Sequence, residues 1–221
     1  MASLAGIKDR VAALKPKVVP TFVVSKVADK YPDVEADDTI RLQWVRSGAD
    51  PLLATVATGR RLAFARKKID SGAWSVLVAI KDGHSIGWIW QTTATEHGWT
   101  SGIPRVKLKS PGERFLFDLW VQREFRRGNV AWLMGEEFFR DCSADPDFDY
   151  VYGFIAYDNV ASIMWHHSVG FTIVQTCNML HIGDSIKWRI PFSDMPRSGP
   201  LSRTGRHNNP EVVVFGPPLL P

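Results

Sequence analysis

The sequence predicts an α/β (α+β) fold, because segments with the pattern of strands alternate along the chain with segments that have the pattern of helices. Residues 115–139 have the pattern of a strand, a short turn and a helix, and residues 150–171 repeat that order. A third observation is the pair of alternating segments 74–80 and 85–92, which are joined through Asp82-Gly83. Asp-Gly between alternating segments is a strong hairpin signal.

Composition indicates one sizeable core with an extension at each end. The chain has 221 residues, of which 45% are hydrophobic, and no apolar run is long enough to cross a membrane. We expect an N-terminal extension (1–38), a central domain (39–191) and a Pro-rich C-terminal tail (192–221). The first 17 residues lack an apolar signal-peptide region, which predicts a cytoplasmic protein.

The remaining elements follow in chain order. Residues 4–14 predict a short helix in the extension, and residues 39–45 the first core strand. One or two helices are expected within residues 51–69, interrupted or bent at Gly59. Residues 96–112 read as a loop. Later strands are expected at residues 172–179 and 185–190, and residues 211–215 could form one more strand or an interface arm.

The turn at residues 125–131 is the first candidate binding site. A helix start offers unpaired backbone N–H groups and about half a positive charge, which suit a phosphate or pyrophosphate. Gly128 and Asn129 tolerate positive φ, so we expect successive N–H groups to point into one concavity. Arg126 and Arg127 add positive charge. The alternative is an ordinary solvated helix start.

Together the two strand–turn–helix segments resemble the GNAT superfamily of acyl-CoA-dependent N-acyltransferases. The first family motif is a hydrophobic strand, Arg/Gln-x-x-Gly-x-Gly/Ala and a helix; Arg126, Asn129 and Ala131 fit it, with Asn129 replacing the usual first glycine. The second motif is a strand ending in Asn and a short helix closing on Gly-Phe. The residues that match its spacing are Asn159, Ser162, Ile163, His166, Gly170 and Phe171.

The resemblance implies a mixed, mostly antiparallel central sheet, splayed at the cofactor strand, with helices on both faces. Acetyl-CoA or another acyl-CoA would be the cosubstrate, with its pyrophosphate on residues 126–131. The cofactor-binding residues implied are Leu119, Val121, Arg126, Arg127, Gly128, Asn129, Val130, Ala131, Asn159 and Ser162. A small-molecule amine or a peptide amine would be the acceptor, in a direct transfer through a ternary complex.

Acyl transfer needs a base for the amine, and two carboxylates are candidates. Asp118 is the only carboxylate within residues 115–121, where apolar neighbours would perturb its pKa. A structural acceptor role is the alternative. Glu113, at the entrance of the strand, could act through a water molecule.

The leaving thiolate needs a proton, and the tyrosine that commonly supplies it in the family is His166 here. An imidazole can supply a proton near neutral pH, although His166 could also simply pack and hydrogen-bond. Tyr157 is the phenolic alternative. Asn159 can bind the cofactor or cap the following helix, and both roles are compatible.

Other features bear on the partners. Trp88 and Trp90 share a face of one strand, which could form an aromatic wall near the acceptor. The six histidines have no ligand spacing, so no metal is expected. Cys142 and Cys177 are interpreted as free buried thiols. The net charge of +4 is spread along the chain, which argues against nucleic acid.

Two other functions stay open. The chain could be a binding or regulatory protein that holds acyl-CoA without turnover, since one fold hosts many functions. It could also be a structural protein that binds nucleic acid through its basic residues and Pro-rich tail, which predicts salt-sensitive association. The terminal extensions could cover a sheet edge or build a homodimer.

Overall fold

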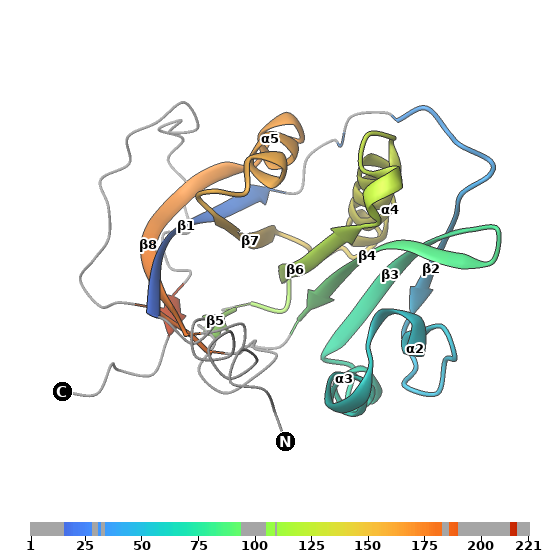
Figure 1. The fold of residues 1–221 in the computed structure, drawn as a ribbon, viewed down its shortest axis with the longest axis horizontal. Helices are drawn as coiled ribbons and strands as arrows, with labels where there is room; N and C mark the ends of the chain where they lie inside the picture. The colour runs from blue at the N-terminus through green and yellow to red at the C-terminus, as the bar shows by residue number, and fades with distance from the viewer. Residues whose placement is uncertain are drawn as a thin grey trace, which may run out of the picture. The chain divides into compact units, whose positions relative to one another are not determined.

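The computed structural model describes residues 16–27, 31, 34–93, 105–108, 110–182, 186–189 and 213–215 (Figure 1). The chain divides into two compact units, each made of segments that are distant in sequence. Unit 1 comprises Met1–Val24, Glu96–Lys107 and Phe154–Pro221, and unit 2 comprises Ser25–Thr95 and Leu108–Gly153. The predicted helix at residues 4–14 lies outside the described residues.

Unit 2 is built on a sheet with the strand order β2-β3-β4-β6-β7. Its strands are β2 (Arg41–Val45), β3 (Trp74–Lys81), β4 (His84–Thr92), β6 (Glu113–Val121) and β7 (Tyr150–Ala156), of which the first four residues of β7 belong to this unit. Each neighbouring pair is antiparallel except β6 and β7, which are parallel. This confirms the predicted mixed, mostly antiparallel sheet.

The β3–β4 hairpin confirms the prediction from Asp82-Gly83. Lys81 pairs with His84, and the two residues between them have φ angles of 49° and 75°. Positive φ at both central positions is the type I′ geometry, which matches the twist of the flanking strands. The turn sequence therefore fixes the register of this hairpin.

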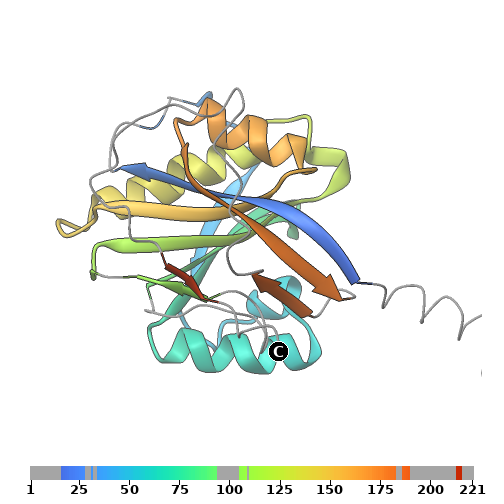
Figure 2. The same ribbon diagram turned by 90° about the vertical axis from the view of Figure 1, so that its left-hand side faces the viewer.

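Helices pack on both faces of the unit 2 sheet, as Figures 1 and 2 show for α3 (Gly59–Asp70) and α4 (Val130–Ser143). The short helix α2 (Leu53–Val56) precedes α3, and the chain between them is extended at Ala57 before Gly59 takes a φ of 54°. The predicted interruption at Gly59 is thereby confirmed. With a helix on each side, β3 is buried from Trp74 to Ile80.

Unit 1 contains the strand order β1-β8-β9, with β1 (Pro16–Val27), β8 (Thr172–Ile182) and β9 (Ile186–Arg189). The helix α5 (Val160–Ser168) belongs to the same unit. A separate two-stranded sheet pairs β5 (Arg105–Lys107) with β10 (Val213–Phe215). The sequence predicted β8 and β9 and gave a strand as one of two alternatives at β10, but it missed β1 and placed β5 within a loop.

No helix in the described part of the chain is long and apolar enough to span a membrane.

Candidate functional site

The middle of β6 is irregular where it runs beside β4. Trp88 pairs with Trp120 and Trp90 with Phe117, so Asp118 and Leu119 together lie opposite the single residue Ile89. Asp118 has a φ of 50°, in the left-handed region that asparagine and aspartate enter more readily than most residues. Two residues opposite one define a β-bulge, a distortion that is common beside functional sites.

The β6–β7 ladder ends close to this bulge. Its last pair is Leu116 with Gly153, although β6 continues to Val121. The edge of β6 beyond Leu116 is therefore not paired by this ladder, in agreement with the predicted splay at the cofactor strand.

A compact turn joins β6 to α4. Gln122 N–H donates to the Ile86 carbonyl at 2.8 Å, and a 3-10 helix, η1, follows over Arg123–Phe125. Arg126 Nε donates to the Val121 carbonyl at 2.9 Å, which folds this side chain back onto the end of the strand. These contacts hold the turn against β4 and β6, while Arg127 is exposed.

The predicted left-handed conformation of this turn is wrong. Gly128 does not have positive φ, and Asn129 has a φ of −88° and a ψ of 6°. The reason is that right-handed turns run continuously into the helix, with Gly128 N–H donating to the Phe125 carbonyl at 3.1 Å. Asn129 instead uses its side chain, whose Nδ2 donates to the Glu35 carbonyl at 3.0 Å.

The first amides of α4 provide the binding capacity. The first helical hydrogen bond runs from Leu133 N–H to the Asn129 carbonyl at 2.9 Å. Within the described residues, the N–H groups of Asn129, Val130, Ala131 and Trp132 have no acceptor. The first turn contains no acidic side chain. The positive end of the helix dipole is thus free to receive an anion.

Gly87 sets how closely this helix start approaches the sheet. A Cβ atom at Gly87 would lie 3.0 Å from the Trp120 carbonyl and 3.3 Å from Val130 Cγ1. Val130 is itself 1% exposed. Close packing at a side-chain-free position therefore fixes the orientation of the unpaired amides.

In unit 1, the structure confirms that Asn159 caps the helix after β7. Its Oδ1 accepts a hydrogen bond from Ser162 N–H at 3.2 Å. The same helix ends at Gly170, which has a φ of 90°, and Phe171 N–H returns to the His166 carbonyl at 2.9 Å. This is the Schellman closure that an Asn-to-Gly-Phe segment favours.

His166 has the environment of a packed side chain. It is 7% exposed and lies between Trp165 and Phe171, at ring-centroid distances of 4.8 and 4.7 Å. Its Nδ1 lies 2.7 Å from the Ser162 carbonyl. Burial lowers the pKa of His166 to about 4, although the bond to Ser162 opposes this shift. These contacts agree with the packing role that the sequence left open for His166, and burial favours the neutral imidazole.

The two candidate carboxylates have opposite environments. Asp118 is exposed, so the expected apolar surroundings are wrong for this residue. Glu113 is 2% exposed and accepts a hydrogen bond from the Tyr152 hydroxyl at 3.3 Å. Burial and the Glu113 carboxylate raise the pKa of Tyr152 well above its usual range. At about 3.3 Å per residue, Glu113 lies roughly 25 Å along β6 from Val121, whereas Asp118 is three residues from it.

Tyr157, the phenolic alternative, is 61% exposed just before α5.

One aromatic contact was missed by the sequence analysis. Trp88 stacks on Trp120 with centroids 4.2 Å apart and an interplanar angle of 18°, and both rings are half-buried. Trp90 is fully buried, so it belongs to the core. Both Trp88 and Trp120 lie in segments predicted as strands, but only the register between those strands shows that the two rings meet.

Solved structures of other proteins resemble this chain. A Drosophila protein aligns over 80% of this chain and 57% of its own, with 13% identity and a TM-score of 0.52. A tandem GNAT protein from the clavulanic acid biosynthesis pathway aligns over 86% of this chain and 58% of its own, with 17% identity and a TM-score of 0.51. An aminoglycoside acetyltransferase from an uncultured soil metagenomic sample aligns over 62% and 90%, with 10% identity and a TM-score of 0.48.

The chain has a GNAT fold, as the likeness to the tandem GNAT protein shows. At this level of identity the likeness concerns the fold alone. The chain spans less than two thirds of the length of the Drosophila protein and of the tandem GNAT protein. No protein-family model and no curated protein matches the sequence.

Proposed function

We propose that the chain is an acyl-CoA-dependent N-acyltransferase that transfers acetyl from acetyl-CoA to a primary amine. The observation that carries the proposal is the row of unpaired amides at Asn129–Trp132, which follows a bulged strand in a GNAT fold. Such amides and the helix dipole suit the pyrophosphate of coenzyme A. In this proposal the exposed side chain of Arg127 adds positive charge beside the pyrophosphate. The backbone of Leu119 and Val121 contacts the pantetheine arm.

The proposed reaction uses groups that lie near the bulge. The acceptor amine attacks the thioester carbonyl in a ternary complex, a C–N bond forms, and the C–S bond breaks. Asp118 takes the proton that the amine loses, as a general base that is open to solvent. A backbone N–H of β6 stabilises the negative charge that develops on the carbonyl oxygen during the attack.

Burial lowers the pKa of His166, which makes its imidazole a poor proton donor for the leaving thiolate. We propose Tyr157 for this step, because its phenol is exposed. Cofactor roles for Asn159 and Ser162 stay predictions from the family resemblance.

A charge placed at the helix start tests the pyrophosphate site. Ala131→Glu puts a carboxylate beside the unpaired amides, which stabilises a helix N-terminus by about 0.3–1 kcal/mol but repels phosphate. We expect coenzyme A affinity, measured by calorimetry, to fall at least tenfold without a loss of thermal stability. Ala131→Gln is the neutral control. Equal affinity in both variants would contradict the site.

Turnover separates the enzyme from an acyl-CoA-binding protein. Asp118→Asn retains a residue type that tolerates the left-handed backbone but removes the base. We expect this variant to bind coenzyme A normally and to lose about 10² to 10⁴-fold in kcat with a responsive amine. Binding by the native chain without turnover across amine classes would favour the non-catalytic function instead.

A further inference from the structure

A cavity of about 240 Å³ lies in unit 2, at the end of the sheet opposite the turn. It is bordered by the start of β3, the end of β4, the start of β6 and the end of α4. At about 30 Å³ per molecule, this volume could hold roughly eight waters. The cavity is smaller than the pockets that bind drug-sized ligands. It therefore suits a small metabolite.

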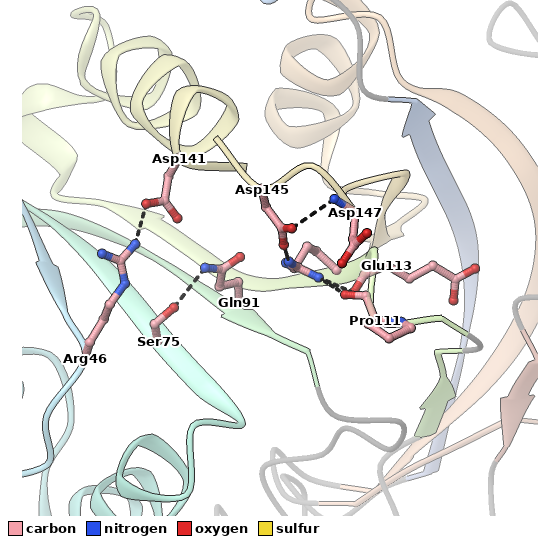
Figure 3. A network of polar contacts seen from close by, with 9 residues as sticks. Arg46, Ser75, Gln91, Pro111, Glu113, Asp141, Asp145 and Asp147 are labelled. Atoms are coloured by element: carbon pink, nitrogen blue, oxygen red, sulfur yellow. Dashed lines mark hydrogen bonds and ion pairs between the residues drawn. The ribbon is translucent and has the colours of Figure 1, made fainter. Parts of the chain in front are cut away.

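Two ion pairs belong to the lining of this cavity: Arg46 with Asp141, and Arg114 with Asp145. Figure 3 shows Arg46 beside Asp141, with Asp145 further along the site. The lining therefore carries two charges of each sign. The arginine of the second pair is tightly held, because Arg114 Nη1 also donates to the Pro111 and Glu113 carbonyls. Its side chain is only 10% exposed.

Arg46 and Asp145 are the more exposed members of the two pairs. The Arg46 side chain is 55% exposed and has only one of its nitrogens paired with Asp141. Asp145 is held in place by Arg114 and by the Asp147 N–H, which donates to Oδ1 at 3.0 Å, yet its side chain is 33% exposed. A half-exposed cation and a one-third exposed anion thus border the same space.

The rest of the lining adds no charge and mixes polar side chains with apolar ones. Gln91 Nε2 donates to Ser75 Oγ at 2.9 Å, and these two residues are 7% and 8% exposed. Figure 3 shows this pair between Arg46 and Asp145. Burial raises the pKa of the Cys142 thiol to about 12, so it contributes no charge. A wholly apolar ligand would leave these polar groups unmatched.

Charge balance selects the ligand class. A simple anion could reach Arg46, but it would also face two aspartates and the negative C-terminal end of α4. A simple cation would face two guanidinium groups. A zwitterion adds one charge of each sign and leaves the balance unchanged.

We propose that this cavity binds a small free α-amino acid, with its carboxylate on Arg46 and its ammonium on Asp145. The site is separate from the turn at residues 126–131, so it is an additional binding function rather than part of the proposed transfer.

Thermal unfolding of the full chain with each of the twenty L-amino acids tests the proposal, because a ligand that binds only the native state raises Tm. The best amino acid is then compared with its analogues that lack the amine or the carboxylate; for alanine these are propionate and ethylamine. We expect a saturable Tm increase with the amino acid and none with either analogue. No increase with any amino acid, or an equal one with an analogue, would overturn the proposal.

Calorimetry on two variants tests the residues. Arg46→Gln changes an exposed side chain, so we expect folded protein with amino-acid affinity reduced at least tenfold. Arg60→Gln removes an exposed arginine on α3 and is the matched control, for which affinity should not change. Equal affinity in the two variants would place the amino acid elsewhere and refute the assignment.

Discussion

The polar groups at the two ends of β6 lie in opposite environments. At the Val121 end, the first amides of α4 are unpaired within the described residues and Arg127 is exposed. At the Glu113 end, polar groups are buried and matched, as in the Arg114–Asp145 pair and the Glu113–Tyr152 hydrogen bond. The exposed end can bind a charged group at little cost in stability, whereas the buried end contributes to the stability of the fold.

Alanine at two glycines, one at each end, should give the largest contrast in stability. A Cβ at Gly112 would lie 1.8 Å from the Asp147 carbonyl, and Gly112 also accepts from Asp149 N–H at 2.9 Å. We expect Gly112→Ala to cost more than about 4 kcal/mol of unfolding free energy, enough to reduce the yield of folded protein.

Gly128→Ala is the matched control, since its Cβ would meet only the Phe125 carbonyl at 3.5 Å and φ is not positive. We expect it to be neutral or to stabilise by about 0.4–1 kcal/mol, through the unfolded chain. Urea unfolding of both variants measures the difference. Similar midpoints would contradict the tight packing at Gly112.

The pH dependence of the free energy of unfolding should distinguish the buried His166 from the exposed His167. The pKa of His166 is lowered from 6.5 to about 4 in the folded chain, so the unfolded chain binds the proton first as pH falls. Stability is then fully present above pH 6.5 and is lost between pH 6.5 and 4. The loss should approach about 3 kcal/mol.

Urea unfolding at several pH values in this window checks the prediction. His166→Gln should lose most of this pH dependence, and the exposed neighbour, in His167→Gln, should keep it. An unchanged pH profile in His166→Gln would show that other groups dominate the titration.

Much of the fold could be predicted from sequence, because its signals are local. Asp82-Gly83 fixed a hairpin, and Asn159 and Gly170 marked the ends of a helix. β1 was missed because Pro16 and Pro20 disfavour a strand interior in isolation. Local propensity also failed at Gly128 and Asn129, which tolerate positive φ but do not adopt it.

The environments of the candidate site residues depend on burial and strand register, which cannot be read from the sequence. The environment of Asp118 was misjudged because apolar sequence neighbours do not reveal that its side chain is exposed at a bulge. The sequence left His166 as either a proton donor or a packed side chain, and its burial between Trp165 and Phe171 favours the second. The cavity went unrecognised because its flanking pair, Arg46 and Asp141, joins residues 95 positions apart.

The smallest predicted contrast compares the two ion pairs at the cavity. Arg114→Ala leaves the one-third exposed Asp145 without its cation and removes the donor to Pro111, so we expect a loss of about 2 kcal/mol, less than for a fully buried pair. Arg46→Ala removes a more exposed guanidinium, which also lies 4.9 Å from the Trp44 ring, and should cost less than about 1 kcal/mol.

Unfolding in low and high salt sharpens this contrast, since salt screens exposed pairs more than buried ones. The difference between native chain and Arg46→Ala should shrink in high salt, while that for Arg114→Ala should persist. If both differences vanish in salt, the Arg114–Asp145 pair behaves as a surface pair. The buried end of β6 would then be stabilised chiefly by close packing at Gly112 rather than by matched charge.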